Sequence, residues 1–446
     1  MRALRLCLRW GAVVLLLWLA RDPVTPWLLA VREHAVAGIV AASLAGIALA
    51  WRGRAAGRIG RAEAAALIAA CSAGAVLAAG NAVAFHAQRD AVRAADATTR
   101  RLGQHFIVGY RDFDEVAVLA ARGLIGGIYV SRRNVRRRGL AEVRAEIDAL
   151  QALRARVGLP PLVVAADQEG GIVAHMTPPL SALPSLATLV AEADAAGRDA
   201  DALAGLARAY GERQGRELAA IGVNLNFGPV VDLRPAGRGP RFDTHTLLAR
   251  RAIAADPHVV AHVAGAYGDG LAAHGVAATL KHFPGLGGVD VDTHHFAARL
   301  DTPAAVLAAR DWLPFRAAAR PAGAIMLGHV VLPGIDPHKP ASLSPAVARD
   351  LLRGKWQYQG LLVTDDINMG AVFRRGPCRT AVEALQAGVD LVLVAYDPDQ
   401  YFRAMHCAAA AAREGRLDPA HPAATRRRIA AVVGLAPPGL KTIAAR

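Results

Sequence analysis

The stretch Leu361-Leu362-Val363-Thr364-Asp365-Asp366 is a short apolar run that ends in two adjacent carboxylates. Continuous runs of this kind are typical of parallel strands buried on both faces. Side chains alternate along a strand, so Asp365 shares a face with Val363 and Asp366 lies on the opposite face. One carboxylate is therefore expected in the mouth of the fold and the other toward a helix layer, and the alternation leaves open which is which.

The same pattern recurs through the chain, with helix-length connections between the runs. The runs are 105–109, 124–130, 162–167, 223–228, 277–282, 324–329, 361–366 and 390–395. Eight strand-then-helix units predict an α/β fold, a (β/α)8 TIM barrel over residues 105–435. A doubly wound open sheet is the structural alternative. No Gly-x-Gly-x-x-Gly opens a helix after any run, which argues against a dinucleotide fold.

The first hundred residues have a different character. They contain three stretches without a charged residue: 22 residues at 64–85, 17 residues at 35–51 and 11 residues at 10–20. Because a bilayer core needs about 20 apolar residues in a helix, we expect two or three membrane-spanning helices within residues 1–85. Helices buried in a soluble protein are the alternative. A linker helix over 86–104 and a tail over 436–446 complete the expected domain organisation.

Arginines set the expected orientation of the spans. Arg52, Arg54, Arg58 and Arg61 lie between the last two apolar runs. Cytoplasmic loops are enriched in such residues, so this loop is expected in the cytoplasm and the barrel on the outer side of the membrane.

Composition narrows the class of protein further. Of 446 residues, 54% are apolar and 20% charged, which excludes a disordered chain. The net charge of +15 is almost entirely arginine, without aromatic-interleaved basic stripes or zinc-finger spacing. We therefore expect no nucleic-acid partner and an anionic lipid surface instead. The four cysteines, Cys7, Cys71, Cys378 and Cys407, form no Cys-x-x-Cys pair and call for no disulfide. Nothing in the sequence indicates an oligomeric state.

Candidate catalytic groups follow the predicted strands. Asp292 and His294 are two residues apart in a Gly- and Pro-rich loop after the fifth run, so an extended loop places both on one face. The carboxylate can then hold one imidazole nitrogen and leave the other to exchange protons. Together with an aspartate nucleophile on the seventh strand, this is the chemistry of a retaining glycosidase. A solvated loop, or a metal site of His282, His294 and His295, is the alternative.

Five motifs in order give the chain a family resemblance: DQEGG at 167–171, NFGPVVD at 226–232, KHFPG at 281–285, DTH at 292–294 and TDDINM at 364–369. Over about residues 102–435 the chain resembles glycoside hydrolase family 3, and within it the single-domain β-N-acetylglucosaminidases of peptidoglycan recycling. The resemblance implies a retaining exo-β-N-acetylglucosaminidase that uses no metal and no cofactor. A β-glucosidase-type exo-glycosidase and a catalytically silent, membrane-bound sugar-binding protein are the alternatives.

The resemblance also assigns roles to residues. It implies that Asp365 is the nucleophile, that His294 is the general acid/base and that Asp292 orients it. It implies that the sugar hydroxyls are held by Asp167, Arg251, Lys281 and His282. The partners implied are a peptidoglycan-derived glycan or muropeptide and membrane lipid. The expected location is the bacterial inner membrane with the barrel on the periplasmic side, the cytoplasmic face being the alternative.

The chain departs from the family's pattern at three positions. Ile172 and His175 stand where the family commonly has arginines, and Leu286 stands where it has a histidine. We still expect His175 among the substrate-binding residues. The three changes bear on the fit of the sugar and of the distal part of the substrate.

Overall fold

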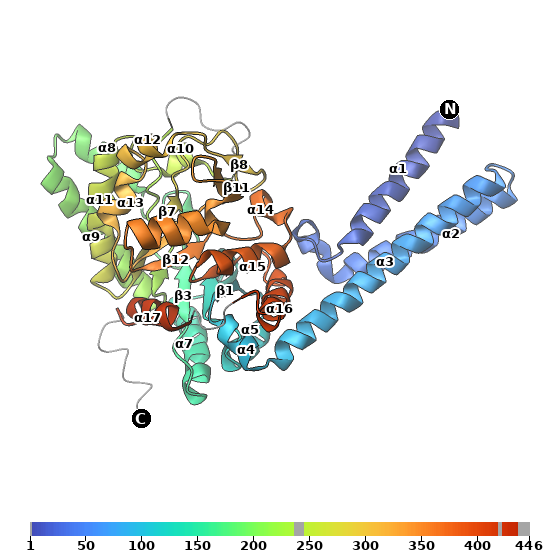
Figure 1. Ribbon diagram of the computed structural model, residues 1–446, viewed down its shortest axis with the longest axis horizontal. Coiled ribbons are helices and arrows are strands. Elements are labelled where there is room, and N and C mark those ends of the chain that lie inside the picture. The colour runs from blue at the N-terminus through green and yellow to red at the C-terminus, as the bar shows by residue number, and fades with distance from the viewer. Residues whose placement is uncertain (1, 236–244, 418–421, 436–446) are drawn as a thin grey trace. The chain divides into compact units, whose positions relative to one another are not determined.

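The computed structural model describes residues 2–235, 245–417 and 422–435, and it divides into two compact units, Met1–Ala94 and Ala95–Arg446 (Figure 1). The expected tail over 436–446 lies outside the described residues.

The larger unit is built on an eight-stranded parallel sheet in the order β12-β9-β7-β6-β3-β2-β1-β13. Its strands are β1 (Phe106–Gly109), β2 (Gly127–Val130), β3 (Val163–Ala166), β6 (Leu225–Asn226), β7 (Ala277–Phe283), β9 (Ala324–Leu327), β12 (Leu361–Thr364) and β13 (Val392–Val394). Seven of the eight predicted runs contain one of these strands, and β7 extends one residue beyond the run 277–282. A parallel bridge between Val363 and Leu391 joins the two edges, so the sheet is a nearly closed barrel rather than an open one.

Helices follow the strands and surround the sheet in Figure 1. They are α4 (Ala97–Gly103), α5 (Phe113–Ala121), α6 (Arg132–Val135), α7 (Leu140–Arg156), α8 (Leu186–Ala195), α9 (Ala200–Ala220), α10 (Leu248–Arg251), α11 (Pro257–Ala272), α12 (Ala304–Ala309), α13 (Leu313–Ala318), the π-helix η3 (Ala346–Lys355), α14 (Gly370–Phe373), α15 (Pro377–Ala387), α16 (Gln400–Arg413) and α17 (Pro422–Val433). Short strands and one 3₁₀ turn outside the barrel sheet lie in the loops that follow several barrel strands. They are β4 (Gln168–Gly170), β5 (Val173–Ala174), β8 (Ala298–Arg299), β10 (Val330–Leu332), β11 (Asp336–Pro340) and the 3₁₀ turn η2 (Ala341–Leu343).

The interior of the barrel is a packed apolar core. Alternate residues of the strands, such as Ile107, Leu361 and Val363, form one buried cluster. Tyr129 and Phe227 stack within it, with ring centroids 5.9 Å apart. Since Leu361 and Val363 belong to this cluster, alternation directs Asp365, two residues on, toward the same interior.

One disulfide lies in the barrel unit, between Cys378 of α15 and Cys407 of α16, whose Cα atoms are 5.2 Å apart. The sequence pattern did not call for this bond, because the two cysteines are 29 residues apart and their proximity depends on the packing of α15 against α16.

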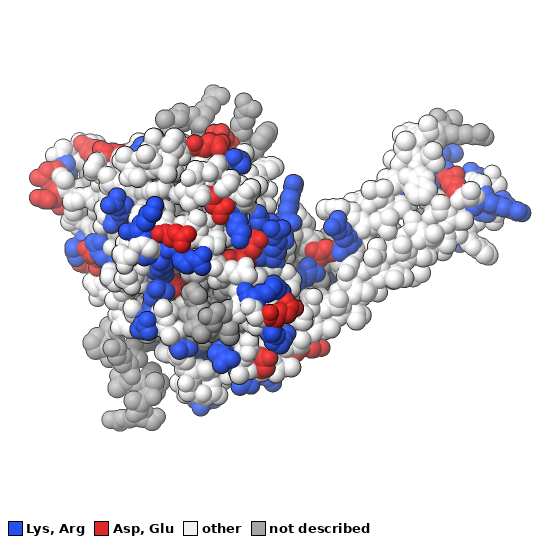
Figure 2. Space-filling view, in the orientation of Figure 1, with Lys and Arg blue, Asp and Glu red and all other residues white. Residues whose placement is uncertain are grey.

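The smaller unit consists of α1 (Arg2–Arg21), the 3₁₀ turn η1 (Pro26–Val31), α2 (Arg32–Ala55) and α3 (Arg61–Ala94). All three expected apolar segments lie inside helices, and each helix is long and apolar enough to cross a membrane. Residues 86–94, expected in a linker helix, continue α3 instead of starting a new helix. Large apolar side chains such as Leu15, Trp18 and Leu49 are more than half exposed. The visible face of this unit is accordingly mostly uncharged, with basic side chains gathered at its ends (Figure 2).

Candidate active site

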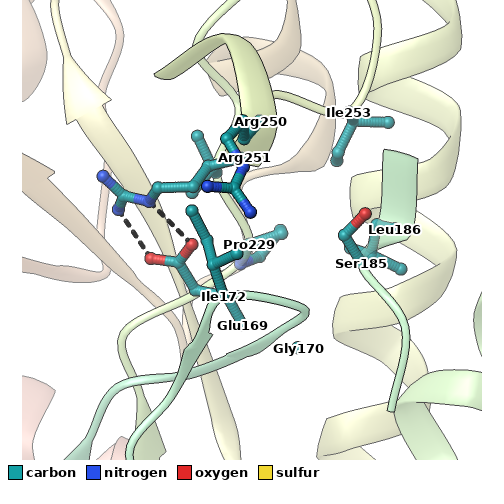
Figure 3. A pocket seen from close by; sticks show the side chains of 10 residues that line it. Glu169, Gly170, Ile172, Ser185, Leu186, Pro229, Arg250, Arg251 and Ile253 are labelled. Atoms are coloured by element: carbon teal, nitrogen blue, oxygen red, sulfur yellow. Dashed lines mark hydrogen bonds and ion pairs between the residues drawn. The ribbon is translucent and has the colours of Figure 1, made fainter. Parts of the chain in front are cut away.

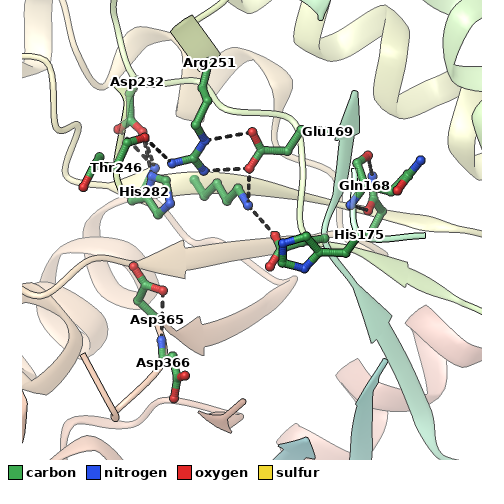
Figure 4. A network of polar contacts seen from close by, with 12 residues as sticks. Gln168, Glu169, His175, Asp232, Thr246, Arg251, His282, Asp365 and Asp366 are labelled. Carbon is green, nitrogen blue, oxygen red and sulfur yellow. Dashed lines mark hydrogen bonds and ion pairs between the residues drawn. The ribbon is translucent and has the colours of Figure 1, made fainter. Parts of the chain in front are cut away.

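The two aspartates that follow β12 have different surroundings (Figure 4). Asp366 accepts hydrogen bonds from the backbone N–H groups of Tyr396 (2.8 Å) and Ala395 (3.1 Å), and from the amide of Asn368 (2.9 Å). Burial nevertheless raises the pKa of Asp366 to about 6. Its side chain thus ties the end of β12 to the segment after β13, and Asp365 is left to face the barrel mouth.

Asp365 lies among imidazoles. Burial by itself would raise the pKa of this carboxyl, but the nearby His282, His329 and His294 hold it below its usual range. A lowered pKa keeps Asp365 ionised at neutral pH, which is the state that a carboxylate nucleophile requires.

His294 is positioned by a buried carboxylate. Its Nδ1 lies 3.0 Å from Oδ1 of Asp292, which is fully buried, while the His294 side chain is 38% exposed. Asp292 also accepts hydrogen bonds from the Thr246 hydroxyl (2.8 Å) and the His245 backbone N–H (2.9 Å). Burial opposes ionisation of Asp292, but these hydrogen bonds and those from His294 hold its pKa well below the usual range. A carboxylate at Nδ1 leaves Nε2 of His294 to exchange protons.

Four charged side chains form a second network at the same end of the barrel (Figure 4). The Lys281 ammonium lies 2.6 Å from both Asp167 and Glu169. Arg251 donates two hydrogen bonds to Glu169, at 2.9 and 2.6 Å. Burial would raise the pKa of Glu169, but the two cations lower it to about 2. The pKa of Asp167 is likewise held well below its ordinary value, mainly by Lys281 and His175 against the effect of burial.

His282 is fixed by a second buried aspartate. Its Nδ1 lies 2.7 Å from Oδ2 of Asp232, which also accepts hydrogen bonds from the backbone N–H groups of His282 (3.1 Å) and Leu286 (2.8 Å). The Leu286 side chain is buried, so the position where the family has a histidine contributes packing and a backbone donor.

The other two departures lie beside the charged network. Ile172, 37% exposed, lines a small hollow of about 10 Å³ together with Ser185 and Arg251 (Figure 3). His175 contacts the Tyr129 hydroxyl at 2.9 Å, and the same hydroxyl donates to Asp167 at 2.9 Å. Burial lowers the pKa of His175, while the neighbouring Asp167 carboxylate acts in the opposite direction.

One group of described residues could hold a metal ion: the ligand atoms of His245, Asp292 and His295 all lie within 4.8 Å of one another. This group differs from the alternative of His282, His294 and His295 that the sequence had suggested. In the structure, Nδ1 of His282 and of His294 each contacts an aspartate.

The structure brings the predicted residues into two adjoining groups. The first joins Asp365, His294, Asp292 and His282, and the second joins Asp167, Lys281, Arg251 and His175. Sequence reasoning did not assign functions to Tyr129, Glu169 or Thr246. Glu169 lies inside the DQEGG motif, and that position is the sequence signal for it. Thr246 lies 46 residues before Asp292, so no local pattern links the two.

Comparison with known proteins identifies the class. Residues 97–432 match the model of the glycosyl hydrolase family 3 N terminal domain. A beta-hexosaminidase of Xylella fastidiosa (strain 9a5c) is 39% identical over 274 residues, which are 61% of this chain and 76% of that protein. A beta-hexosaminidase of Stenotrophomonas maltophilia (strain R551-3) is 38% identical over 63% of this chain and 79% of that protein.

Solved structures agree. The glycoside hydrolase family 3 beta-N-acetylglucosaminidase of Paenibacillus sp. str. FPU-7 superposes with a TM-score of 0.68 and 30% identity, over 76% of this chain and 63% of that one. The beta-N-acetylhexosaminidase of Beutenbergia cavernae DSM 12333 superposes with a TM-score of 0.65 and 30% identity. The match covers 76% of this chain and 98% of that one. Barrel and site together therefore define a glycoside hydrolase. The chain belongs to glycosyl hydrolase family 3.

Proposed function

We propose that this chain is a membrane-tethered, retaining exo-β-N-acetylglucosaminidase that removes terminal β-linked N-acetylglucosamine from peptidoglycan fragments. The observation that carries the proposal is an imidazole held by a buried aspartate, His294 on Asp292, in a loop joined to the segment that follows Asp365. The backbone carbonyl of His294 accepts a hydrogen bond of 2.7 Å from the N–H of Gly370 in that segment. A retaining glycosidase needs one ionised carboxylate and one proton donor at the same sugar.

In the first step, the Asp365 carboxylate attacks C1 of the sugar and the glycosidic C1–O bond breaks. His294 gives the proton on Nε2 to the departing oxygen, while Asp292 stabilises the imidazolium before the transfer. The products are a glycosyl ester of Asp365 and the shortened glycan.

In the second step, His294 takes a proton from a water molecule through Nε2, and the water oxygen attacks C1. The ester bond to Asp365 breaks, the sugar leaves with its original β configuration, and both side chains regain their starting states. Each group acts twice, so neither can be lost without loss of turnover.

The charged network supports recognition of a terminal sugar. Asp167, Lys281 and Arg251 offer carboxylate, ammonium and guanidinium groups at one place, and such groups make strong hydrogen bonds to neighbouring hydroxyls. The names of the relatives point to N-acetylhexosamine as the sugar. Ile172 offers an apolar contact where the family commonly offers a cation, which favours a less anionic distal group on the substrate.

Parallel assays with p-nitrophenyl β-N-acetylglucosaminide and β-glucoside test the proposal. We expect kcat/KM for the acetylated substrate to be at least a hundredfold higher, and proton NMR to show the β-anomer as the first product. Preference for the glucoside would make the chain a β-glucosidase-type enzyme. No turnover of either substrate would make it a sugar-binding protein.

We further propose that α1, α2 and α3 span the bacterial inner membrane and that the barrel lies on the periplasmic side. Arg52, Arg54 and Arg58 near the α2–α3 turn support a cytoplasmic position for that turn. The disulfide between Cys378 and Cys407 supports an oxidising compartment for the barrel. The test is a pair of carboxyl-terminal fusions: alkaline phosphatase active and green fluorescent protein dark supports export, and the opposite pair places the barrel in the cytoplasm.

A further inference from the structure

The helical unit contains a cavity of about 460 Å³ bordered by all three of its helices. The α2 helix packs closely on α3, α1 packs mainly on α3, and α1 and α2 contact each other little. The cavity therefore lies between α1 and α2, with α3 as its floor. Its size is within the range of cavities that hold small ligands, roughly 300–1,000 Å³.

Small residues of α2 shape this cavity. A Cβ atom at Gly46 would lie only 2.6 Å from Sγ of Cys71, so glycine at this position lets α2 approach α3. Ala42, one helical turn earlier on α2, borders the cavity with only a methyl group and leaves the space beside it open. The opening is thus a consequence of side-chain size along one helix.

The two ends of the cavity differ in chemistry. Arg5, Arg9 and Arg58 border the end near the α2–α3 turn, and Arg9 is placed there by an ion pair with Glu63 at 2.6 Å. The remaining wall is apolar, as with Val13 and Leu16 of α1 and Leu49 and Leu67 of α2 and α3.

The charges do not cancel at the cationic end. Arg9 shares its charge with Glu63, while Arg5 and Arg58 add two further guanidinium groups to the border. Guanidinium groups bind phosphate oxygens with paired hydrogen bonds. A ligand that fits both ends has an anionic phosphate head and an apolar tail.

We propose that this cavity binds one anionic phospholipid of the surrounding bilayer. The phosphate contacts Arg5 and Arg58, and an acyl chain lies along Val13 and Leu16 between α1 and α2. The proposal rests on the membrane insertion proposed above, which places the arginine end at the cytoplasmic leaflet, where anionic lipids attract basic side chains.

Native mass spectrometry of the full chain, released from nanodiscs that contain equal phosphatidylglycerol and phosphatidylcholine, tests the site. We expect one retained phosphatidylglycerol per chain and at least a tenfold preference over phosphatidylcholine. The double variant Arg5→Gln, Arg58→Gln should retain roughly 30-fold less phosphatidylglycerol. The matched control Arg52→Gln, Arg54→Gln removes two arginines near the same turn that do not border the cavity, and it should change retention by less than twofold.

A variant that fills the cavity tests the contribution of its shape separately from that of its arginines. Ala42→Leu keeps every arginine but occupies the cavity, so it should also lose the retained lipid, and it decides the question if the double variant does not insert. Equal retention of both lipids, equal losses in the double variant and its control, or preferential retention of an added polyprenyl phosphate would overturn the proposal. Alkaline carbonate extraction is done first: release of the chain from membranes refutes insertion itself, whereas an inserted chain without lipid preference refutes only the site.

Discussion

Glu169→Gln is the perturbation that tests the charged network most sharply. Glu169 is buried and accepts hydrogen bonds from Arg251 at 2.9 and 2.6 Å, and Lys281 lies 2.6 Å from it. Glutamine has nearly the same shape but no charge, so the variant leaves two buried cations with one carboxylate, Asp167, between them.

The magnitude follows from the pKa of Glu169. The cations lower it from 4.5 to about 2, and at 1.36 kcal/mol for each pKa unit this corresponds to roughly 3 kcal/mol of stability at neutral pH. Removing one partner from a buried ion pair costs a similar amount, about 3–5 kcal/mol. Lys281 keeps its contact with Asp167, which favours the lower end of that range.

The direction in which the stability contributed by Glu169 changes with pH follows from its lowered pKa. Because folding lowers the pKa of Glu169, its contribution is complete above about pH 4.5 and is lost as the pH falls toward 2. Thermal unfolding of the full chain in detergent should show a lower Tm for Glu169→Gln at pH 7, and a difference less than half as large at pH 3. Glu192→Gln, an exposed change on α8, is the control and should leave Tm unchanged. Equal Tm values at pH 7, or a difference at pH 3 as large as the one at pH 7, would refute the reasoning.

Three other predictions address the reaction and the location of the barrel. Asp365→Asn and His294→Ala should each lower kcat on p-nitrophenyl β-N-acetylglucosaminide by at least a hundredfold. Neither change should alter Tm by more than a few degrees. If one of these variants keeps its kcat, that residue takes no part in the mechanism. Micromolar Zn²⁺ should inhibit hydrolysis by binding Asp292 together with His295, and EDTA should restore the activity. If Zn²⁺ inhibits His295→Ala equally well, the ion binds at another site. Replacing both Cys378 and Cys407 by serine should cost about 3–4 kcal/mol of stability in protein isolated from membranes under oxidising conditions, and no loss would mean that the bond is not formed there.

The barrel strands could be predicted because buried parallel strands are continuous apolar runs, and each of the eight runs coincides with an observed strand to within a few residues. Alternation also separated Asp365 from Asp366 correctly. It could not say which one faces the mouth, because that depends on tertiary packing: Leu361 and Val363 lie in the barrel core, and the backbone after β13 binds Asp366.

The pairing of Asp292 with His294 could be predicted because the two residues are neighbours in one loop. The partners that complete the pair could not, because Thr246 and His245 come from a different segment of the chain. For the same reason the disulfide was missed. Contacts between distant segments depend on how the helices pack, and a single sequence carries little direct record of that packing.

The central claim is that Asp365 forms a covalent bond to the sugar. Incubating the protein with a 2-fluoro glycoside, which slows the second step, followed by proteolysis and peptide mass spectrometry, tests it directly. We expect one added fluoro-sugar for each chain, with fragment ions that place it on Asp365. A label on Asp366, or steady turnover of an active substrate without any labelled peptide, would contradict the account.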